Sequence, residues 1–198
     1  DFFSYQIGVD FNHETGYGKR IKDTTQQIGD YAGFLSMKFT PWPVLSIQPG
    51  LRVIYNRNYN APLVYSINIK WGIAEPLAMR VSAAKGFRAP SLKELYLNFD
   101  DVNHSIFGNP DLVAESSHNY NLALNYKHNS AAAYNWGIEL GFFYNQIHDK
   151  IELKQVTADA VYSYINIDEF YTQGFEINFN NRIYPWLKLN LGFSYTGR

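Results

Sequence analysis

The amino-acid sequence predicts an all-β protein, an antiparallel up-and-down segment of a transmembrane β-barrel. Nine stretches alternate between apolar and polar residues with a period of two, the spacing of a strand with one apolar and one polar face. The connections between these stretches are short at one end and long at the other. Outer-membrane barrels, with short periplasmic turns and longer extracellular loops, have this asymmetry.

Each predicted strand follows from its own alternation. The clearest is 135–145, where the even positions from Trp136 to Tyr144 are apolar and most odd positions are polar or glycine. The first five strands carry their apolar residues at odd positions instead, less cleanly in the second and the fifth. In chain order the nine predicted strands span residues 3–11, 31–39, 45–55, 63–71, 77–87, 120–126, 135–145, 175–179 and 187–195.

The connections and the charges fit a barrel. Residues 41–43, 74–76, 128–134 and 184–186 form the short connections, 57–62 is intermediate, and 13–29, 88–116 and 148–170 are predicted to be long loops. All four tryptophans lie near the short turns, as an interfacial belt requires. Lys85 breaks the rule that charge avoids the apolar face, but it lies near a strand end, where such a charge costs little. Charged residues within the strands otherwise lie on the polar face: Asp10, Lys38, Arg52, Lys70, Arg80, Glu139, Glu176 and Lys188.

Composition narrows the alternatives. The 198 residues contain 16 Tyr, 14 Phe and no Cys, and the net charge of −1 gives no electrostatic reason to expect nucleic acid as a partner. No nucleophile motif of a hydrolase is present, so we do not expect an enzyme. A soluble β-sandwich stays open as an alternative fold. Because bacterial barrels generally have an even number of strands, the chain is expected to be part of a larger barrel.

The longest interruption of the strand pattern is bracketed by two short boxes. The first box is Phe87, Arg88, Ala89 and Pro90, and the second box is Asn109, Pro110, Asp111 and Leu112. Pro90 ends the strand, and Ser91 with Glu94 predicts a capping box for a short helix over residues 92–97. Pro110 predicts a turn that redirects the chain toward the next strand.

These boxes, with Glu115 after the second, residues 171–176 and residues 194–196, resemble the barrel of TonB-dependent outer-membrane receptors from about Tyr31 onward. The resemblance implies residues 1–198 as part of one 22-stranded barrel domain in the outer membrane of a Gram-negative bacterium, in contact with its lipid. It also implies an N-terminal plug, through which the TonB complex supplies energy. Plug and closing strands are expected to lie outside this sequence.

The resemblance also suggests a ligand. Haem and haemoglobin receptors of this family carry a histidine between similar boxes, and here His104 occupies that interval. His104 is therefore the candidate ligand of haem iron, Tyr96 is a second candidate, and Arg88 or Lys85 could pair with the propionates. Haem would be a transported ligand, supplied free or by a haem-carrying protein, and no intrinsic cofactor is expected. His104 could equally be a solvated loop residue in a siderophore or cobalamin receptor, and a passive porin also stays open.

Overall fold

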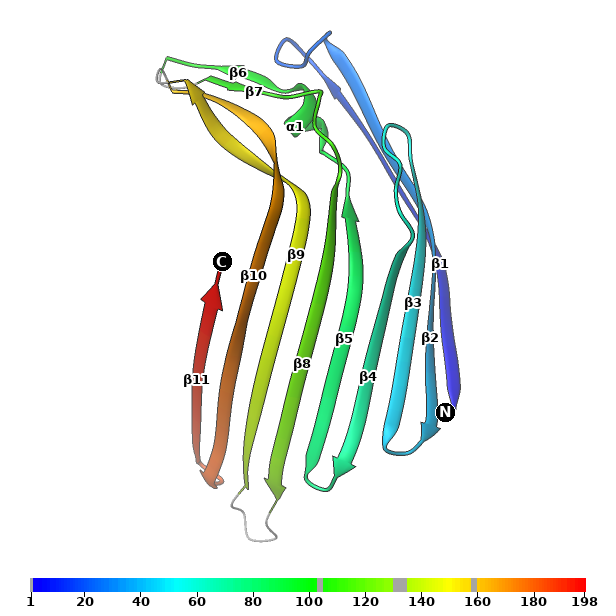
Figure 1. Cartoon of the computed structure of the whole chain (residues 1–198), viewed down its shortest axis with the longest axis vertical. Helices are drawn as coiled ribbons and strands as arrows, with labels where there is room; N and C mark the ends of the chain where they lie inside the picture. The colour runs from blue at the N-terminus through cyan, green and yellow to red at the C-terminus, as the bar shows by residue number, and fades with distance from the viewer. Residues whose placement is uncertain (1, 103–104, 130–134, 158–159) are drawn as a thin grey trace.

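The computed structural model describes residues 2–102, 105–129, 135–157 and 160–198, and it shows one curved sheet (Figure 1). All strand pairs in it are antiparallel except that of β7 with β10. The nine predicted strands are confirmed as the nine long strands of the described part of the chain. Two short strands, β6 and β7, lie within the interruption of the pattern. The strands are β1 (Phe3–Tyr17), β2 (Thr25–Trp42), β3 (Leu45–Asn56), β4 (Val64–Ala74), β5 (Leu77–Arg88), β6 (Asn98–Asp100), β7 (Ser105–Phe107), β8 (Glu115–Asn129), β9 (Asn135–Thr157), β10 (Val161–Tyr184) and β11 (Leu187–Gly197).

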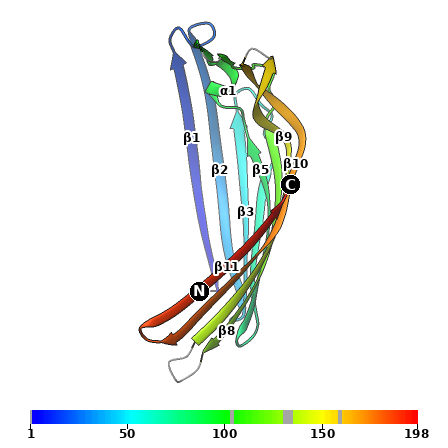
Figure 2. The ribbon, with the colours of Figure 1, turned by 90° about the vertical axis from the view of Figure 1, so that its left-hand side faces the viewer.

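Each long strand pairs with the next long strand along the chain, so the sheet is an up-and-down meander. The order of the long strands is β1-β2-β3-β4-β5-β8-β9-β10-β11. On the same side of β10 as β11, β7 pairs with the first three residues of β10, and β6 pairs with β7. All strands of the described residues belong to this single sheet, which rules out the two packed sheets of a sandwich. Viewed along the sheet, the strands form an open curved wall (Figure 2).

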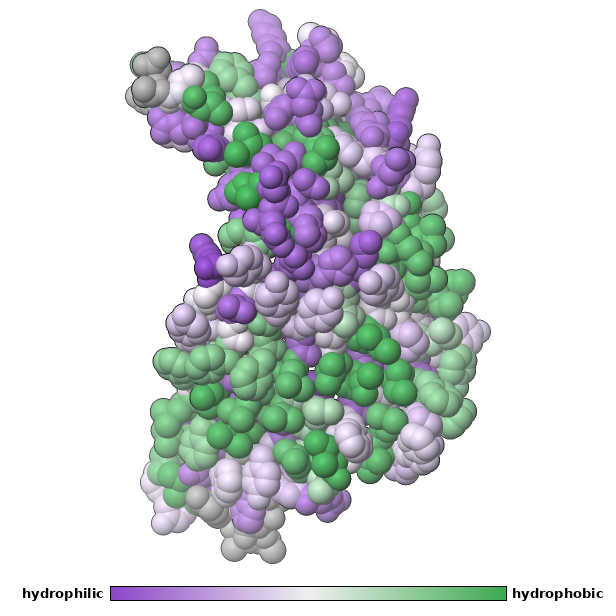
Figure 3. Space-filling model, in the orientation of Figure 1, coloured by the Kyte–Doolittle hydropathy of each residue, from purple (hydrophilic) through white to green (hydrophobic). Residues whose placement is uncertain are grey.

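The two faces of the wall differ as a barrel requires. Alternate residues of β1, among them Tyr5, Ile7 and Val9, expose apolar side chains on the outer face. On the inner face of the same strand Asp10 pairs with Arg52 of β3 at 2.7 Å. The outer view shows apolar side chains concentrated in the half near the short turns, and hydrophilic ones toward the long loops (Figure 3). This band is the surface that meets lipid.

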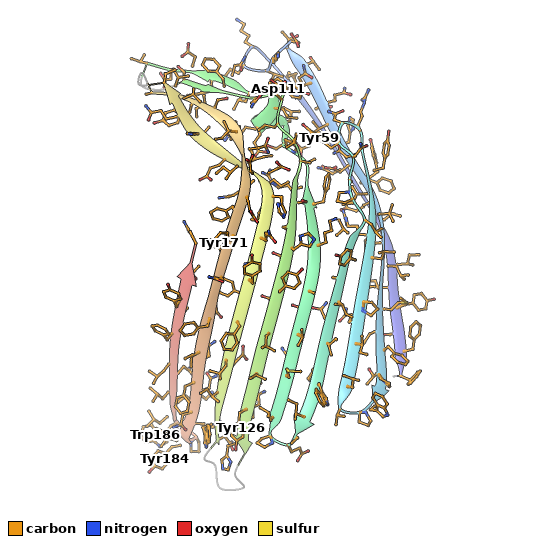
Figure 4. All side chains as sticks on the ribbon, viewed as in Figure 1. Tyr59, Asp111, Tyr126, Tyr171, Tyr184 and Trp186 are labelled. Atoms are coloured by element: carbon orange, nitrogen blue, oxygen red, sulfur yellow. The ribbon has the colours of Figure 1, made fainter. Side chains whose placement is uncertain are left out.

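Aromatic residues mark both borders of the band. Tyr126, Tyr184 and Trp186 lie at the short turns, and Tyr171 lies higher, toward the loop end (Figure 4). Rings at the upper border lie close to one another across neighbouring strands: the Tyr31 and Tyr55 ring centroids are 6.3 Å apart, and those of Tyr120 and Tyr144 are 6.4 Å apart. Two aromatic girdles of this kind flank the apolar band of outer-membrane barrels.

The prediction of long loops was wrong at two of three places. β9 continues to Thr157 and β10 begins at Val161, so most of 148–170 is strand. β1 and β2 likewise extend to Tyr17 and from Thr25. These extensions rise beyond the apolar band, where neither face of a strand meets lipid. Their residues therefore lose the alternation on which the prediction relied.

The most buried side chains lie at the loop end. Leu95, Leu112, Ile151 and Tyr164 form a small core, against which Tyr96 packs. Two of these core residues come from the interrupted region, and two come from the extensions of β9 and β10. The fold therefore concentrates its best-packed site where the β5–β8 connection meets those extensions. No helix among the described residues is long and apolar enough to span a membrane.

Candidate functional site: the connection between β5 and β8

The connection leaves β5 at the first box and forms a short helix at once. Helix α1 (Leu92–Tyr96) begins after Ser91, whose side chain accepts a hydrogen bond from the backbone N–H of Glu94. The Glu94 carboxylate in turn accepts a bond from the backbone N–H of Ser91 at 2.7 Å. The predicted capping box is confirmed, and the helix ends one residue earlier than predicted, with Leu97 as its C-cap.

Helix α1 lies across the inner side of the curved wall. It follows β5, yet it contacts β1 and β2, which are several strands away in the sheet. Leu97 forms an isolated bridge with Ile21, in the β1–β2 connection. Leu92 packs against Gly16 of β1 so closely that a Cβ atom there would lie 2.5 Å from a Leu92 methyl group. The connection therefore spans part of the barrel mouth.

Arg88 of the first box holds the two ends of the connection together. Its Nε and one terminal nitrogen donate to the Glu115 carboxylate at 2.8 and 2.7 Å, and the other terminal nitrogen donates to Glu94 at 2.9 Å. Glu115 also accepts a 2.6 Å hydrogen bond from the backbone N–H of Ile151 on β9. A planar guanidinium is suited to such bidentate contacts. The network joins β5, α1, β8 and β9 above the apolar band.

The electrostatics of this network stabilise its charged form. Partial burial raises the pKa of Glu94 and of Glu115, but the hydrogen bonds from Arg88, with those from Ser91 and from the Ile151 N–H, outweigh burial. The net pKa of each carboxyl therefore lies below its ordinary value. The hydrogen bond to Glu115 is the largest cause of the raised pKa of Arg88. All three groups are ionised near neutral pH.

The second box brackets the other end of the connection. The Asn109 side chain donates to the Tyr164 carbonyl of β10 at 3.0 Å and accepts from the backbone N–H of Asp111 at 3.0 Å. Leu112 is buried in the small core, and its carbonyl accepts a bond from the Tyr59 hydroxyl at 3.1 Å. Burial, then the nearby Tyr96, raise the pKa of Tyr59. Pro110 and Asp111 are exposed at the turn.

Gly108 allows the second box to lie against the helix. A Cβ atom at this position would be 2.6 Å from the Tyr96 backbone nitrogen and 2.7 Å from the Leu95 carbonyl atoms. The Gly108 N–H donates to the Leu97 carbonyl at 2.7 Å, and the Asn109 N–H donates to the backbone carbonyl of Glu94 at 2.8 Å. Only glycine permits so close an approach of two backbones. The returning chain is thereby fixed on the C-terminal end of α1.

Between the boxes the chain forms a hairpin attached to the sheet. β6 pairs antiparallel with β7, and β7 pairs in parallel with the start of β10 through Ser105, Ile106 and Phe107. The Ser163 hydroxyl donates to the Phe107 carbonyl at 3.1 Å. The hairpin is therefore an extension of the β9–β10 ladder, lying beside it at the loop end (Figure 1).

Three of the four predicted ligand residues lie in the described part of the chain, and they occupy different surroundings. His104 lies outside the described residues. Tyr96 is half-buried against the small core, and Arg88 is engaged by two carboxylates. Lys85 lies on the outer face. Its register partner His118 is two residues from Tyr120, which is exposed on that face, and side chains two residues apart in a strand, like those of register partners, share one face. The geometry so far favours a structural role for Arg88 and Tyr96.

The sequence analysis did not predict two sets of contacts. These are the contacts of Arg88 with Glu94 and Glu115, and the hydrogen bond from the Asn109 side-chain amide to Tyr164. Glu94 had been noted only as a capping residue and Glu115 only as part of the motif. Their shared partner could have been inferred from charge, since an arginine ending one strand and a glutamate starting its neighbour meet when the strands are antiparallel. No group of three or more metal-ligating side chains occurs among the described residues.

Comparisons with known proteins agree with this architecture. The sequence model of the family described as TonB dependent receptor-like, beta-barrel, matches residues 1–198. The iron-regulated outer membrane virulence protein of Vibrio cholerae is 29% identical over 210 residues, which cover 96% of this chain and 31% of that protein. Hemoglobin and hemoglobin-haptoglobin-binding protein B of Haemophilus influenzae is 27% identical over 147 residues, covering 72% of this chain and 13% of that protein.

Solved structures show the same fold. The siderophore receptor PirA of Pseudomonas aeruginosa superposes with a TM-score of 0.81 at 18% identity, covering 98% of this chain and 36% of that one. The hemophore receptor HasR of Serratia marcescens, in complex with its hemophore HasA and heme, superposes with a TM-score of 0.80 at 12% identity, covering 99% and 39%. The chain thus spans about a third of the length of the Vibrio relative and of these receptors.

Proposed function

Because the chain belongs to the TonB-dependent receptor β-barrel family and forms part of an outer-membrane barrel, we propose that its protein takes up iron as haem. The transported ligand binds at the β5–β8 connection, and His104 ligates the iron. Transport draws energy from the TonB complex through an N-terminal plug. This is a receptor function without a catalytic step.

The observation that carries the proposal is the bracketing of the β6–β7 hairpin. The Arg88 network fixes the start of the connection, Gly108 and Asn109 fix its return, and β7 pairs with β10. Since β6 ends at Asp100 and β7 begins at Ser105, His104 belongs to the link between two anchored strands. A metal ligand works best when its supporting residues are held in place.

Chemistry and relatives support haem as the ligand. A neutral imidazole is a common axial ligand of haem iron. A Haemophilus influenzae relative is named for binding hemoglobin, and it aligns with 72% of this chain. Within the proposal the ligand arrives as free haem or on a haem-carrying protein. Tyr96 and Arg88 support the site structurally, through the small core and the carboxylate network, while Lys85 lies on the outer face.

The test is a haem titration of the full-length protein in detergent, followed by the Soret band. We expect native protein to bind haem with a shifted band, and His104→Ala to weaken binding at least tenfold, about 1.4 kcal/mol. His13→Ala is the matched control, because His13 is an exposed histidine near the loop end of β1 and should leave binding unchanged. Equal binding by native protein and His104→Ala would refute the assignment of His104.

The second candidate is uptake of a ferric siderophore. The internal engagement of Arg88 and Tyr96 favours it, because both boxes then act only as structural brackets. In that case haem does not shift the Soret band in any variant, while iron-siderophore complexes quench the intrinsic tryptophan fluorescence of the native protein.

A further inference from the structure

A group of cations lies on the inner face of the wall, near the short turns. Lys70 of β4 and Arg80 of β5 are direct register partners. Both are exposed on the face opposite the apolar Trp71 and Val81. Directly opposed residues on one face have Cβ atoms about 4.5–5.5 Å apart, so two like charges in this position repel and destabilise the sheet.

The pair lines a cleft of about 370 Å³ together with a third cation, Lys38 of β2. The other polar lining groups are the hydroxyl groups of Ser46 and Ser82 and the side-chain amides of Gln48, Asn68 and Asn121. Asn121 donates to the Ser82 hydroxyl at 3.2 Å, which fixes its orientation. Ammonium, guanidinium, hydroxyl and amide groups all offer donors, and no carboxylate lines the cleft.

The described residues do not neutralise these cations. The four ion pairs of the described chain involve Arg52, Arg88 (twice) and Lys150, and none involves Lys38, Lys70 or Arg80. On the same face, Asp10 forms an ion pair with Arg52. Glu139 and Glu176 lie on β9 and β10, which are separated from β5 by β8. Glu75 precedes β5 in the short turn but does not line the cleft.

A second pair repeats the arrangement. Arg182 of β10 is the register partner of Lys188 of β11 on the inner face. With Lys127, both line a separate cleft of about 250 Å³ whose remaining lining includes four asparagines and no carboxylate. Two cross-strand cation pairs on one wall indicate a surface arranged to attract anions, since a concave low-dielectric wall focuses its field.

We propose that the cleft of Lys38, Lys70 and Arg80 binds multivalent oxyanions, carboxylate or phosphate, on the lumenal wall near the periplasmic end. The Arg80 guanidinium binds one oxyanion group in a bidentate manner, and the two ammonium groups supply the remaining charge. In its biological role the inference rests on the proposed function, which it deepens. The transported ligand carries free anionic groups, and this cleft is a second binding site for it, below the loop site.

The experiment is thermal unfolding of the full-length protein in detergent, with citrate or pyrophosphate added at ionic strength held constant with sodium chloride. Native protein should be stabilised by one or both anions in a saturable manner. Arg80→Gln and Lys70→Gln should each raise the apparent Kd of that anion at least roughly tenfold, the loss expected for one charged hydrogen-bonding group. The two anions distinguish carboxylate from phosphate preference.

The anion-free protein gives an independent readout. Relief of the Lys70–Arg80 repulsion should leave Arg80→Gln as stable as native protein or more stable. Lys19→Gln, an exposed lysine in the β1–β2 connection, is the control that should change neither quantity. An anion response that is equal in native protein and both cleft variants overturns the site. So does a marked destabilisation of Arg80→Gln without anion, which would mean that another part of the protein already neutralises Arg80. Haem titration of the same variants separates this outcome from failure of the proposed function.

Discussion

Arg88 and Glu115 are register partners at the loop ends of β5 and β8, and two hydrogen bonds of 2.8 and 2.7 Å join guanidinium and carboxylate. The chain leaves the sheet directly after Arg88 and returns to it at Glu115. The Arg88–Glu115 ion pair therefore joins the two ends of the 26-residue β5–β8 connection, which contains α1 and the β6–β7 hairpin. The stability of the candidate site depends on this ion pair.

Glu115→Gln should weaken the connection. The variant loses the charge-assisted bonds to Arg88 and weakens the bond from the Ile151 N–H. Since the Arg88 side chain is 44% exposed, we expect a loss of about 1–2 kcal/mol, below the full value for a buried pair. Faster proteolytic cleavage between α1 and β8 would measure it. Glu152→Gln removes an exposed pair with Lys150 and should have little effect, so an equal response of both variants contradicts the role of Glu115.

Acid should break the same interactions of Arg88 with Glu94 and Glu115. Glu94 and Glu115 have a lower pKa in the folded protein than in the unfolded chain, so their contribution is complete above the ordinary glutamate pKa of about 4.3. It is lost as pH falls through the lower folded pKa. Hydrogen exchange of α1 amides, corrected for intrinsic rates, should accelerate in this acidic range. Glu115→Gln should show a shallower dependence; an identical pH profile in native protein and variant would argue against the linkage.

Gly108→Ala should displace the second box from the helix. The new Cβ would lie 2.6–2.7 Å from backbone atoms of Leu95 and Tyr96, which cannot move aside as a flexible side chain could. Overpacking of this kind costs about 1–3 kcal/mol. Thermal unfolding and ligand titration should both reveal the change. The control is Gly33→Ala, where no atom lies within 4 Å of the added Cβ, and a comparable loss there would remove the explanation.

Ile7→Lys tests which face meets lipid. Ile7 is 74% exposed on the outer face in the middle of the apolar band, and a lysine there should cost about 2–4 kcal/mol of barrel stability in a bilayer. The neighbouring Gln6→Lys places the same charge on the inner face and should be tolerated. Folded fractions in lipid vesicles, separated by heat-modifiable gel mobility, report the difference. Greater sensitivity at Gln6 would invert the assignment of the faces.

Period-two alternation predicted all the long strands because lipid and lumen impose opposite demands on successive residues. The helix start was also predictable, since Ser91 and Glu94 satisfy each other locally. Neither β6 nor β7 could be read in this way. Each has only three residues, and β7 depends on a parallel pairing with Val161–Ser163, more than fifty residues later in the chain. Such pairing depends on tertiary contact, which local periodicity does not record.

The same contrast between local sequence signals and tertiary contacts applies to the site residues. The two boxes correctly marked where the chain leaves and rejoins the sheet, because proline and glycine act on the local backbone. The engagement of Arg88 by Glu94 and Glu115 follows from strand register and helix placement together. Lys85 was correctly assigned to the apolar face from the alternation of the strand. It lies outside the lumen and is therefore separated from Arg88, although Arg88 follows only three residues later.

The extensions of β9 and β10 have a steric consequence for whatever approaches the mouth. From His148, level with Ser116 of β8, β9 continues to Thr157, a contour length of roughly 30 Å at the rise of a strand. The β6–β7 hairpin stands at the tip of these extensions, because β7 pairs with Val161–Ser163 at the start of β10. A globular partner that approaches the mouth therefore meets the hairpin and the strand tips first, and helix α1, which packs lower down against Ile151 and Tyr164, only afterwards.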